Sequence, residues 1–186
     1  EMYAVLWIRL PERLAVHLPW LLSHGFTMHH ATRDYIMVVR PRSSSAVIPL
    51  YGTHYARVEC VVVEYGTGRI LLVKESTGPD SVFKLVTGSI DCNEYVSKAA
   101  RREVKEETGI ECDIAGVLGL GNRLCTRFGK DEILIGILMY ARQGQVPKGD
   151  SREIVEAVWM EPSEALSTSS LMGKEWIMTA LSTTLR

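Results

Sequence analysis

The chain has 186 residues, of which 46% are hydrophobic, and its formal net charge at pH 7 is −1. This is enough material for the buried core of one ordinary domain, with room for a small extension. A charge so close to zero excludes a global electrostatic footprint for nucleic acid or anionic lipid, so nucleic acid is not an expected partner. The longest apolar runs, such as residues 133–140, are far too short to cross a bilayer, so no membrane contact is expected either.

Cysteine usage and the first residue bear on the cellular setting. None of the cysteines belongs to a Cys-x-x-Cys pair, which argues against a zinc site, and their scatter is unlike a dense disulfide framework. We expect buried free thiols at Cys60, Cys92, Cys112 and Cys125. Because the first residue is Glu1 rather than methionine, we expect a preceding segment to have been trimmed.

Residues 1–50 are predicted to form a small βαββ unit. An amphipathic helix is predicted from Pro11 to about Ser23, and Gly25 is its stop. Runs rich in β-branched and aromatic residues predict the strands of this unit at residues 3–10, 26–29 and 35–40. A unit of this size is small for independent stability, so it is expected to pack on the rest of the chain.

Residues 51–186 predict a mixed sheet between helices. A hairpin turn is expected at Gly66-Thr67-Gly68, between the first two strands of this part. Strands are predicted at residues 57–65, 69–74, 83–86, 111–120, 133–140 and 154–160. Helices are predicted at residues 95–108, 162–166 and 174–181.

The most informative segment surrounds an acidic helix. Residues 95–108 contain no Gly or Pro and are rich in Ala, Lys, Arg and Glu, so a helix is predicted there, and Gly109 supplies a left-handed stop. On a 3.6-residue period Glu103 and Glu107 lie one turn apart on one face, with Glu106 beside them. Like charges at this spacing repel, whereas a hard divalent cation such as Mg²⁺ binds carboxylate oxygens and keeps waters that a phosphate can displace.

The spacing of the whole segment narrows its interpretation. A lone Glu-Glu pair has a solvated acidic face as its alternative. The full pattern is Gly88, five residues, Glu94, seven residues, Arg102-Glu103, an aliphatic residue, any residue, Glu106-Glu107, any residue, Gly109 and an aliphatic residue. This pattern fits every fixed position of the Nudix box, so the chain resembles the Nudix hydrolase superfamily. The resemblance implies an α/β fold: a Nudix α/β/α sandwich with a mixed sheet, preceded by the small βαββ unit.

Segments outside the box are similar to the plant-type ADP-ribose and NADH pyrophosphatases, which carry a short unit before the Nudix domain. The matching segments are Gly25-Phe26, His29-His30-Ala31, Tyr35-Ile36-Met37, Phe83-Lys84, Phe128-Gly129-Lys130, Glu153-Ile154 and Trp159-Met160. That subgroup usually has Trp-Lys-Phe-Pro before the box glycine, whereas this chain has Phe83-Lys84-Leu85-Val86. Substrate stacking or loop shape is therefore expected to differ.

The chain also resembles some oomycete RXLR avirulence effectors, which carry a Nudix domain of this plant-like type after a leader. Gly78-Pro79 then resembles the Gly-Pro site on which host cyclophilin acts in such an effector, with an ordinary loop turn as the alternative. The resemblance implies either a cytoplasmic protein or one that is secreted and translocated into the cytoplasm of a host cell.

The Nudix resemblance implies roles for the box residues. The ligands of Mg²⁺ or Mn²⁺ would be Glu103, Glu106 and Glu107. The Gly88 carbonyl would complete the metal shell, because a glycine lets the backbone approach the ion closely. An ion pair between Arg102 and Glu94 would hold the loop against the helix, and Gly109 would end that helix.

Other side chains are candidates for the base and for substrate binding. The general base is expected to be Glu103 or Glu153, with Glu156 as a third candidate whose alternative is a solvent-facing strand residue. Basic side chains that are candidates to line a phosphate-binding cleft, each with an ordinary surface position as its alternative, are Arg57, Lys74, Lys84, Arg123, Arg127 and Lys130. His29 and His30 are adjacent on a predicted strand and should point to opposite faces, so packing or hydrogen bonding is expected rather than one shared metal ion. The tryptophans are expected in the core, with stacking on adenine as the alternative for an exposed one.

These features predict a metal-dependent pyrophosphohydrolase acting on a nucleoside diphosphate linked to another moiety, with ADP-ribose and NADH as expected substrates. Diphosphoinositol polyphosphates and capped RNA are alternative substrates. The first would need a dense basic cleft, and the second a basic surface track with aromatic contacts to the cap. The alternative of a different class is a module that keeps the fold and works mainly by protein binding.

Overall fold

The computed structural model describes residues 4–76, 82–124, 126, 129–149, 153–168 and 171–184. The chain divides into two compact units, Glu1–Thr53 and His54–Arg186. Each unit has a hydrophobic core of its own residues. Within the described ranges, no helix combines the length and the apolar composition that crossing a membrane requires.

The first unit is a three-stranded antiparallel sheet with one helical segment. Its elements are β1 (Val5–Pro11), the 3₁₀ helix η1 (Glu12–His17), α1 (Leu18–Ser23), β2 (Thr27–Ala31) and β3 (Tyr35–Pro41). Strand β3 lies between β1 and β2. Leu10, Leu21, Phe26 and Val38 are the buried core. The βαββ order predicted from the sequence is confirmed.

The helical segment differs from the single predicted helix. It is a 3₁₀ helix that passes into an α-helix at Leu18. Pro19 explains the change, because a proline in a helix interior has no N–H to donate and its ring clashes with the preceding turn. In the first turn of α1 those N–H groups have no partner within the helix, so Pro19 is tolerated there.

The second unit contains a six-stranded mixed sheet. Its strands are β4 (His54–Glu64), β5 (Ile70–Glu75), β6 (Val86–Ser89), β7 (Cys112–Arg123), β8 (Asp131–Ala141) and β9 (Ile154–Met160). The order is β7-β8-β4-β5-β9, and β6 pairs with β4. Strands β4 and β8 are parallel and the other pairs are antiparallel. The α/β class with a mixed sheet is therefore confirmed.

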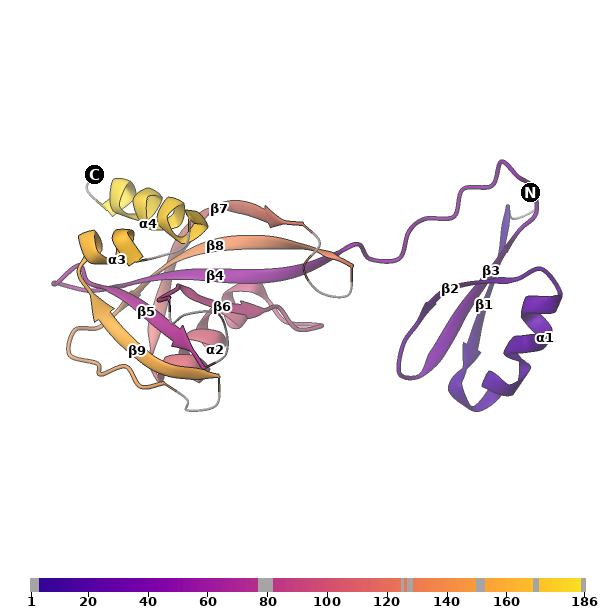
Figure 1. Cartoon of the computed structure of the whole chain (residues 1–186), viewed down its shortest axis with the longest axis horizontal. Helices are drawn as coiled ribbons and strands as arrows, with labels where there is room; N and C mark the ends of the chain where they lie inside the picture. The colour runs from indigo at the N-terminus through magenta and orange to yellow at the C-terminus, as the bar shows by residue number, and fades with distance from the viewer. Residues whose placement is uncertain are drawn as a thin grey trace. The chain divides into compact units, whose positions relative to one another are not determined.

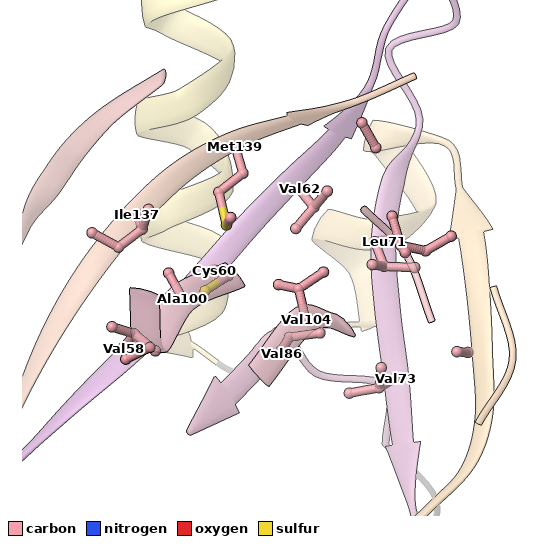
Figure 2. Packing of buried hydrophobic residues seen from close by; sticks show 14 of the residues in the cluster. Val58, Cys60, Val62, Leu71, Val73, Val86, Ala100, Val104, Ile137 and Met139 are labelled. Atoms are coloured by element: carbon pink, nitrogen blue, oxygen red, sulfur yellow. The ribbon is translucent and has the colours of Figure 1, made fainter. Parts of the chain in front are cut away.

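Helices cover both faces of this sheet, as Figure 1 shows. They are α2 (Val96–Thr108), α3 (Pro162–Thr168) and α4 (Leu171–Thr184). Val58, Cys60 and Val62 of β4 pack with Ala100 and Val104 of α2 (Figure 2). The alternate residues of β4 join the cluster that includes α3 and α4, because successive side chains of a strand point to opposite faces. The result is the α/β/α sandwich.

Strand β4 changes partner along its length. Residues 57–60 pair with β6, whereas β5 pairs with β4 only at Val63 and Ile70. The predicted strand at 83–86 is instead β6, which begins at Val86, and Lys84 forms only an isolated bridge with Val73. Strand β6 in turn contacts the middle of α2, where Arg102 donates a hydrogen bond to the Ser89 carbonyl.

Some predicted core residues are at the surface. Trp176 is buried, but Trp7 of β1 and Trp20 of α1 are exposed, because a unit of this size has too little chain to bury every large apolar side chain. Among the cysteines, Cys60 is buried, Cys112 is partly buried and Cys92 is exposed in the loop before α2. Cys125 lies outside the described residues.

Candidate active site

Helix α2 positions the acidic side chains. Its cap is Tyr95 in an extended conformation, and Gly109 ends it at φ 71°, the left-handed conformation predicted for that glycine. Ala99, Ala100 and Val104 fix one side of the helix on the sheet. Glu103 and Glu107, which lie one position before and three positions after Val104, are therefore held at the edge of this contact.

Gly88 of β6 allows Glu103 to lie directly on the strand backbone. A Cβ placed on Gly88 would be 1.7 Å from the Cδ of Glu103 and 2.1 Å from its Oε1. No side chain fits into that space, so only glycine permits this approach. The glycine and the glutamate, 15 positions apart in the chain, therefore form one feature of the site.

Arg102 joins the loop to the helix. Its Nε and Nη2 donate to the two carboxylate oxygens of Glu94, both at 2.8 Å, and Nη2 also donates to the Ser89 carbonyl at 2.9 Å. Its Nη1 donates to Glu103 at 2.8 Å and to Glu106 at 3.1 Å. These hydrogen bonds from Arg102 hold the pKa of Glu94 at about 2. The predicted Arg102–Glu94 pair is thus present as a bidentate contact.

Glu107 is the carboxylate whose environment is least suited to a charge. Burial is the main reason why the pKa of Glu107 is raised to about 8; the carboxylates of Glu103, Glu75 and Glu153 act in the same direction, while Lys84 opposes them. Its Oε2 is buried and, among the described residues, has no hydrogen-bond partner. An acidic group of this kind in a cleft is a candidate functional group.

The acidic side chains meet in a cleft of about 390 Å³. Its lining consists of Arg57, Glu75, Thr87, Gly88, Ser89, Glu103, Glu107 and Glu153. Glu75 was not predicted from the sequence, because it is brought to Glu153 only by the pairing of β5 with β9, in which Glu75 is opposite Ile154. Four carboxylates and one guanidinium thus surround this cleft.

Sequence comparison assigns the fold to a family. Residues 54–179 match the NUDIX domain family, and residues 1–41 match a Nudix hydrolase domain. The chain belongs to the Nudix family. Nudix hydrolase 5 of Arabidopsis thaliana is 32% identical over 165 residues, which cover 86% of this chain and 54% of that protein. Nudix hydrolase 7 of the same plant is 31% identical over 163 residues, which cover 86% of this chain and 58% of that protein.

The matched proteins are longer than this chain, and the solved structures are similar to it in fold. The chain spans 46–59% of the length of the Arabidopsis Nudix hydrolases that it matches. Among solved structures, the NUDIX domain of Shewanella oneidensis NrtR complexed with ADP ribose has a TM-score of 0.57 at 17% identity. That match covers 72% of this chain and 90% of the other, and at this identity it shows the fold alone.

The carboxylate oxygens of the Nudix box are of the type that binds a divalent cation, although these side chains are not arranged around a common position for the ion. Within the described ranges, no group of three or more His, Cys, Asp or Glu side chains forms a ready metal site. Arg102 instead holds Glu103 and Glu106 on one guanidinium nitrogen. The buried oxygen of Glu107 and the carboxylate of Glu103 in the same cleft are hard oxygen donors of the kind that Mg²⁺ and Mn²⁺ prefer.

The other predicted site residues lie in different places. Glu106 is 60% exposed and does not line the cleft. Lys84 makes an ion pair with Glu75 at the cleft edge, whereas Lys130 lies over the ring of Tyr55, 5.2 Å from its centroid. Glu156 pairs with Lys74 at the surface, which favours the solvent-facing alternative. Arg127 and the Gly78-Pro79 dipeptide lie outside the described residues.

His29 and His30 do not point to opposite faces as predicted. A bulge in β2 between Met28 and His30 brings their Nδ1 atoms to 2.7 Å. The other ring nitrogens are engaged as well, with the Pro49 carbonyl at 2.6 Å from His29 and the Tyr35 hydroxyl at 3.2 Å from His30. The expected hydrogen-bonding role agrees with these contacts, but its geometric reason was wrong.

A second cavity, of about 680 Å³, lies away from the acidic cleft. Its lining includes Arg101, Lys105, Glu111 and Asp113. These four side chains already form two ion pairs with one another. None of the box glutamates lines this cavity, so the smaller cleft is the candidate active site.

Proposed function

We propose that this Nudix domain hydrolyses the diphosphate of a nucleoside diphosphate linked to another moiety, with ADP-ribose or NADH as substrate, in a metal-dependent reaction. The observation that supports it most is the buried, unpartnered oxygen of Glu107 beside Glu103 in an acidic cleft. Four carboxylates around one cleft are costly unless a cation lies among them. For ADP-ribose, water adds across the P–O–P anhydride and the products are AMP and ribose 5-phosphate.

The proposed ligands of Mg²⁺ or Mn²⁺ are Glu103 and Glu107, with Glu106 and the Gly88 carbonyl completing the set. When bound, a divalent cation supplies charge neutralisation at the diphosphate and lowers the pKa of a bound water. Glu106 and Glu103 share Arg102 as hydrogen-bond donor, so a small rotation of either side chain makes its oxygens available.

The remaining residues of the cleft would bind substrate and move a proton. Arg57 is proposed to donate to a diphosphate oxygen, since its guanidinium lines the cleft and charge-assisted hydrogen bonds are strong. Lys84 would supply a point charge at the cleft edge. Glu153 and Glu103 both line the cleft and stay the candidates for the base that accepts the proton of the attacking water.

The charges of the cleft bear on the choice of substrate. Its lining contains one cation, Arg57, and four carboxylates. A densely anionic diphosphoinositol polyphosphate would meet that surface with repulsion, so a dinucleotide-like diphosphate is favoured over it. The NrtR domain that shares this fold is complexed with ADP ribose, which agrees with the proposed substrate class. Capped RNA is the third substrate to assay.

We also propose a division into an N-terminal unit, residues 1–50, and a hydrolase domain, residues 51–186, and assign the chemistry to the second. A role as a pathogen effector inside a host cell, with host cyclophilin acting at Gly78-Pro79, is supported by sequence resemblance alone. A function mainly in protein binding is the alternative, and the complete set of box glutamates argues against a domain that has lost catalysis.

The test is phosphate chemistry with matched variants. Wild type, Glu106→Gln and Glu107→Gln are assayed with Mg²⁺ or Mn²⁺ on ADP-ribose, NADH, diadenosine polyphosphates, capped RNA and diphosphoinositols. We expect hydrolysis of ADP-ribose or NADH by the wild type, loss by orders of magnitude in both variants and none with chelator. Glu175→Gln, an exposed glutamate of α4, is the control and should keep full activity. Hydrolysis that persists in Glu107→Gln would reject this metal site.

A further inference from the structure

Arg57 lies at the junction of the cleft and a buried polar network. Its side chain is only 16% exposed and lines the cleft. Its Nη1 donates to Oε1 of Glu132 at 3.3 Å, and its Nη2 donates to the Thr87 carbonyl at 3.3 Å. Its Nε is buried and has no partner among the described residues. Two of its nitrogens are thus tied to the sheet while the side chain borders the acidic cleft.

The network continues through three more side chains to α4. Arg123 of β7 pairs with Glu132 at 4.0 Å and with Oε1 of Glu59 at 3.5 Å. The other oxygen of Glu59 accepts a hydrogen bond from Nε1 of Trp176 at 2.9 Å. Glu59 and Glu132 are 2% and 3% exposed. Two buried carboxylates therefore alternate with two guanidiniums between the cleft and the helix.

The backbone around Trp176 is shaped for this contact. A Cβ on Gly119 or on Gly136 would be 2.9 Å from the indole ring, so both neighbouring strands have glycine where the ring lies. The position of the indole nitrogen, and hence of Glu59, is set by that fit. The network thus starts from a rigid point on α4.

Stability alone does not account for such a network. Replacing buried ion pairs with apolar side chains of similar volume is often neutral or stabilising, because desolvation offsets the attraction. A buried pair is more useful where it holds a charged group in one orientation, as binding of a diphosphate requires. In this network, the charged group that would need to be held in one orientation is Arg57, because it lines the cleft.

We propose that Glu132 is a positioning residue: it holds Arg57 in the orientation that binds the substrate diphosphate, and Arg123, Glu59 and Trp176 hold Glu132 in turn. The substrate in this statement rests on the proposed function, whereas the ordering of Arg57 by Glu132 does not. Because Glu132 acts through Arg57, its effect on substrate binding should vanish when Arg57 is absent.

A double-mutant cycle with Arg57→Ala tests the substrate part. Glu132→Gln keeps the size of the side chain and removes its charge, so we expect KM for ADP-ribose to rise about tenfold with kcat changed less than about twofold. In the Arg57→Ala background the same substitution should leave KM unchanged. If Glu132→Gln raised KM by the same factor with and without Arg57, the proposal would be overturned, since Glu132 would then act without Arg57.

Glu64→Gln is the matched control. Glu64 of β4 is also buried and also bound by an arginine, Arg69, at 2.6 Å, but Arg69, unlike Arg57, does not line the cleft. We expect Glu64→Gln to lower the melting temperature without raising KM. A rise in KM equal to that of Glu132→Gln would overturn the proposal, because loss of any buried carboxylate would then explain it.

A measurement without substrate separates this inference from the proposed function. The arginine Nε–H signal of Arg57, identified by its loss in Arg57→Ala, is followed by NMR. We expect slow exchange with solvent in the wild type, because this atom is buried, and exchange at least several-fold faster in Glu132→Gln. Unchanged exchange would overturn the ordering role. If the wild type hydrolyses none of the assayed diphosphates, the proposed function fails and this signal still decides the role of Glu132.

Discussion

Replacing Glu107 with glutamine is expected to stabilise the metal-free protein as the pH rises, even though the same change removes the proposed activity. The folded protein raises the pKa of Glu107 to about 8 from an ordinary value of 4.5. A group with a raised folded pKa keeps its stability contribution below the unfolded value and loses it as the pH rises to the folded value. For Glu107 the loss therefore occurs between pH 4.5 and about pH 8.

The size of the effect depends on that difference in pKa. Each pKa unit corresponds to about 1.36 kcal/mol, so a difference of about 3.5 gives at most about 5 kcal/mol. The Glu107 side chain keeps some contact with solvent, which screens its charge, so we expect roughly 1–3 kcal/mol. Glutamine has no charge to desolvate and should show none of this loss.

The assay is urea unfolding of wild type and Glu107→Gln in chelator, at intervals from about pH 4.5 to about pH 9. We expect the unfolding free energy of the variant to exceed that of the wild type by a margin that grows up to about pH 8 and is then constant. Glu175→Gln reports the general effect of removing one negative charge. A margin that is independent of pH would refute the raised pKa of Glu107 and the reasoning built on it.

Three further outcomes are expected from contacts in the structure. Gly88→Ala should lower kcat/KM about a hundredfold with little change in melting temperature, because its Cβ would displace the flexible Glu103 carboxylate; wild-type kinetics would contradict this. Arg102→Ala should lower the melting temperature near neutral pH. Because the pKa of Glu94 is lowered to about 2, this difference from wild type should shrink as the pH falls from 4.5 toward 2. A difference in melting temperature that stays constant with pH would count against this reasoning. Burial and His29 lower the pKa of His30, so wild type should lose stability relative to His30→Gln as the pH falls through the histidine range, and parallel pH profiles of melting temperature would exclude this.

Local patterns in the sequence account for the elements of the hydrolase unit. The helix at 95–108 differs by one residue from α2, and the strand at 154–160 is β9 as predicted. Both depend on signals within one segment: a run without Gly or Pro that ends at Gly109, and a β-rich run between turns. The Arg102–Glu94 contact was predictable for the same reason, because both residues belong to one short motif.

Contacts between distant segments were beyond the sequence. Glu75 joins the cleft only because β5 pairs with β9, and Glu132 reaches Arg57 only because β8 runs parallel to β4. His29 and His30 meet because of a bulge that no alternation pattern reveals. In each case the deciding quantity is strand register, which depends on partners far away in the chain.

By itself the sequence determined the family, most of the elements and the acidic face of α2, since spacing along one helix or one strand dictates them. The tertiary structure alone decided which carboxylates share the cleft, which of them lose their water, and which arginine is held there. Burial and charge interactions arise only when separate strands and helices pack together, so no local pattern contains them.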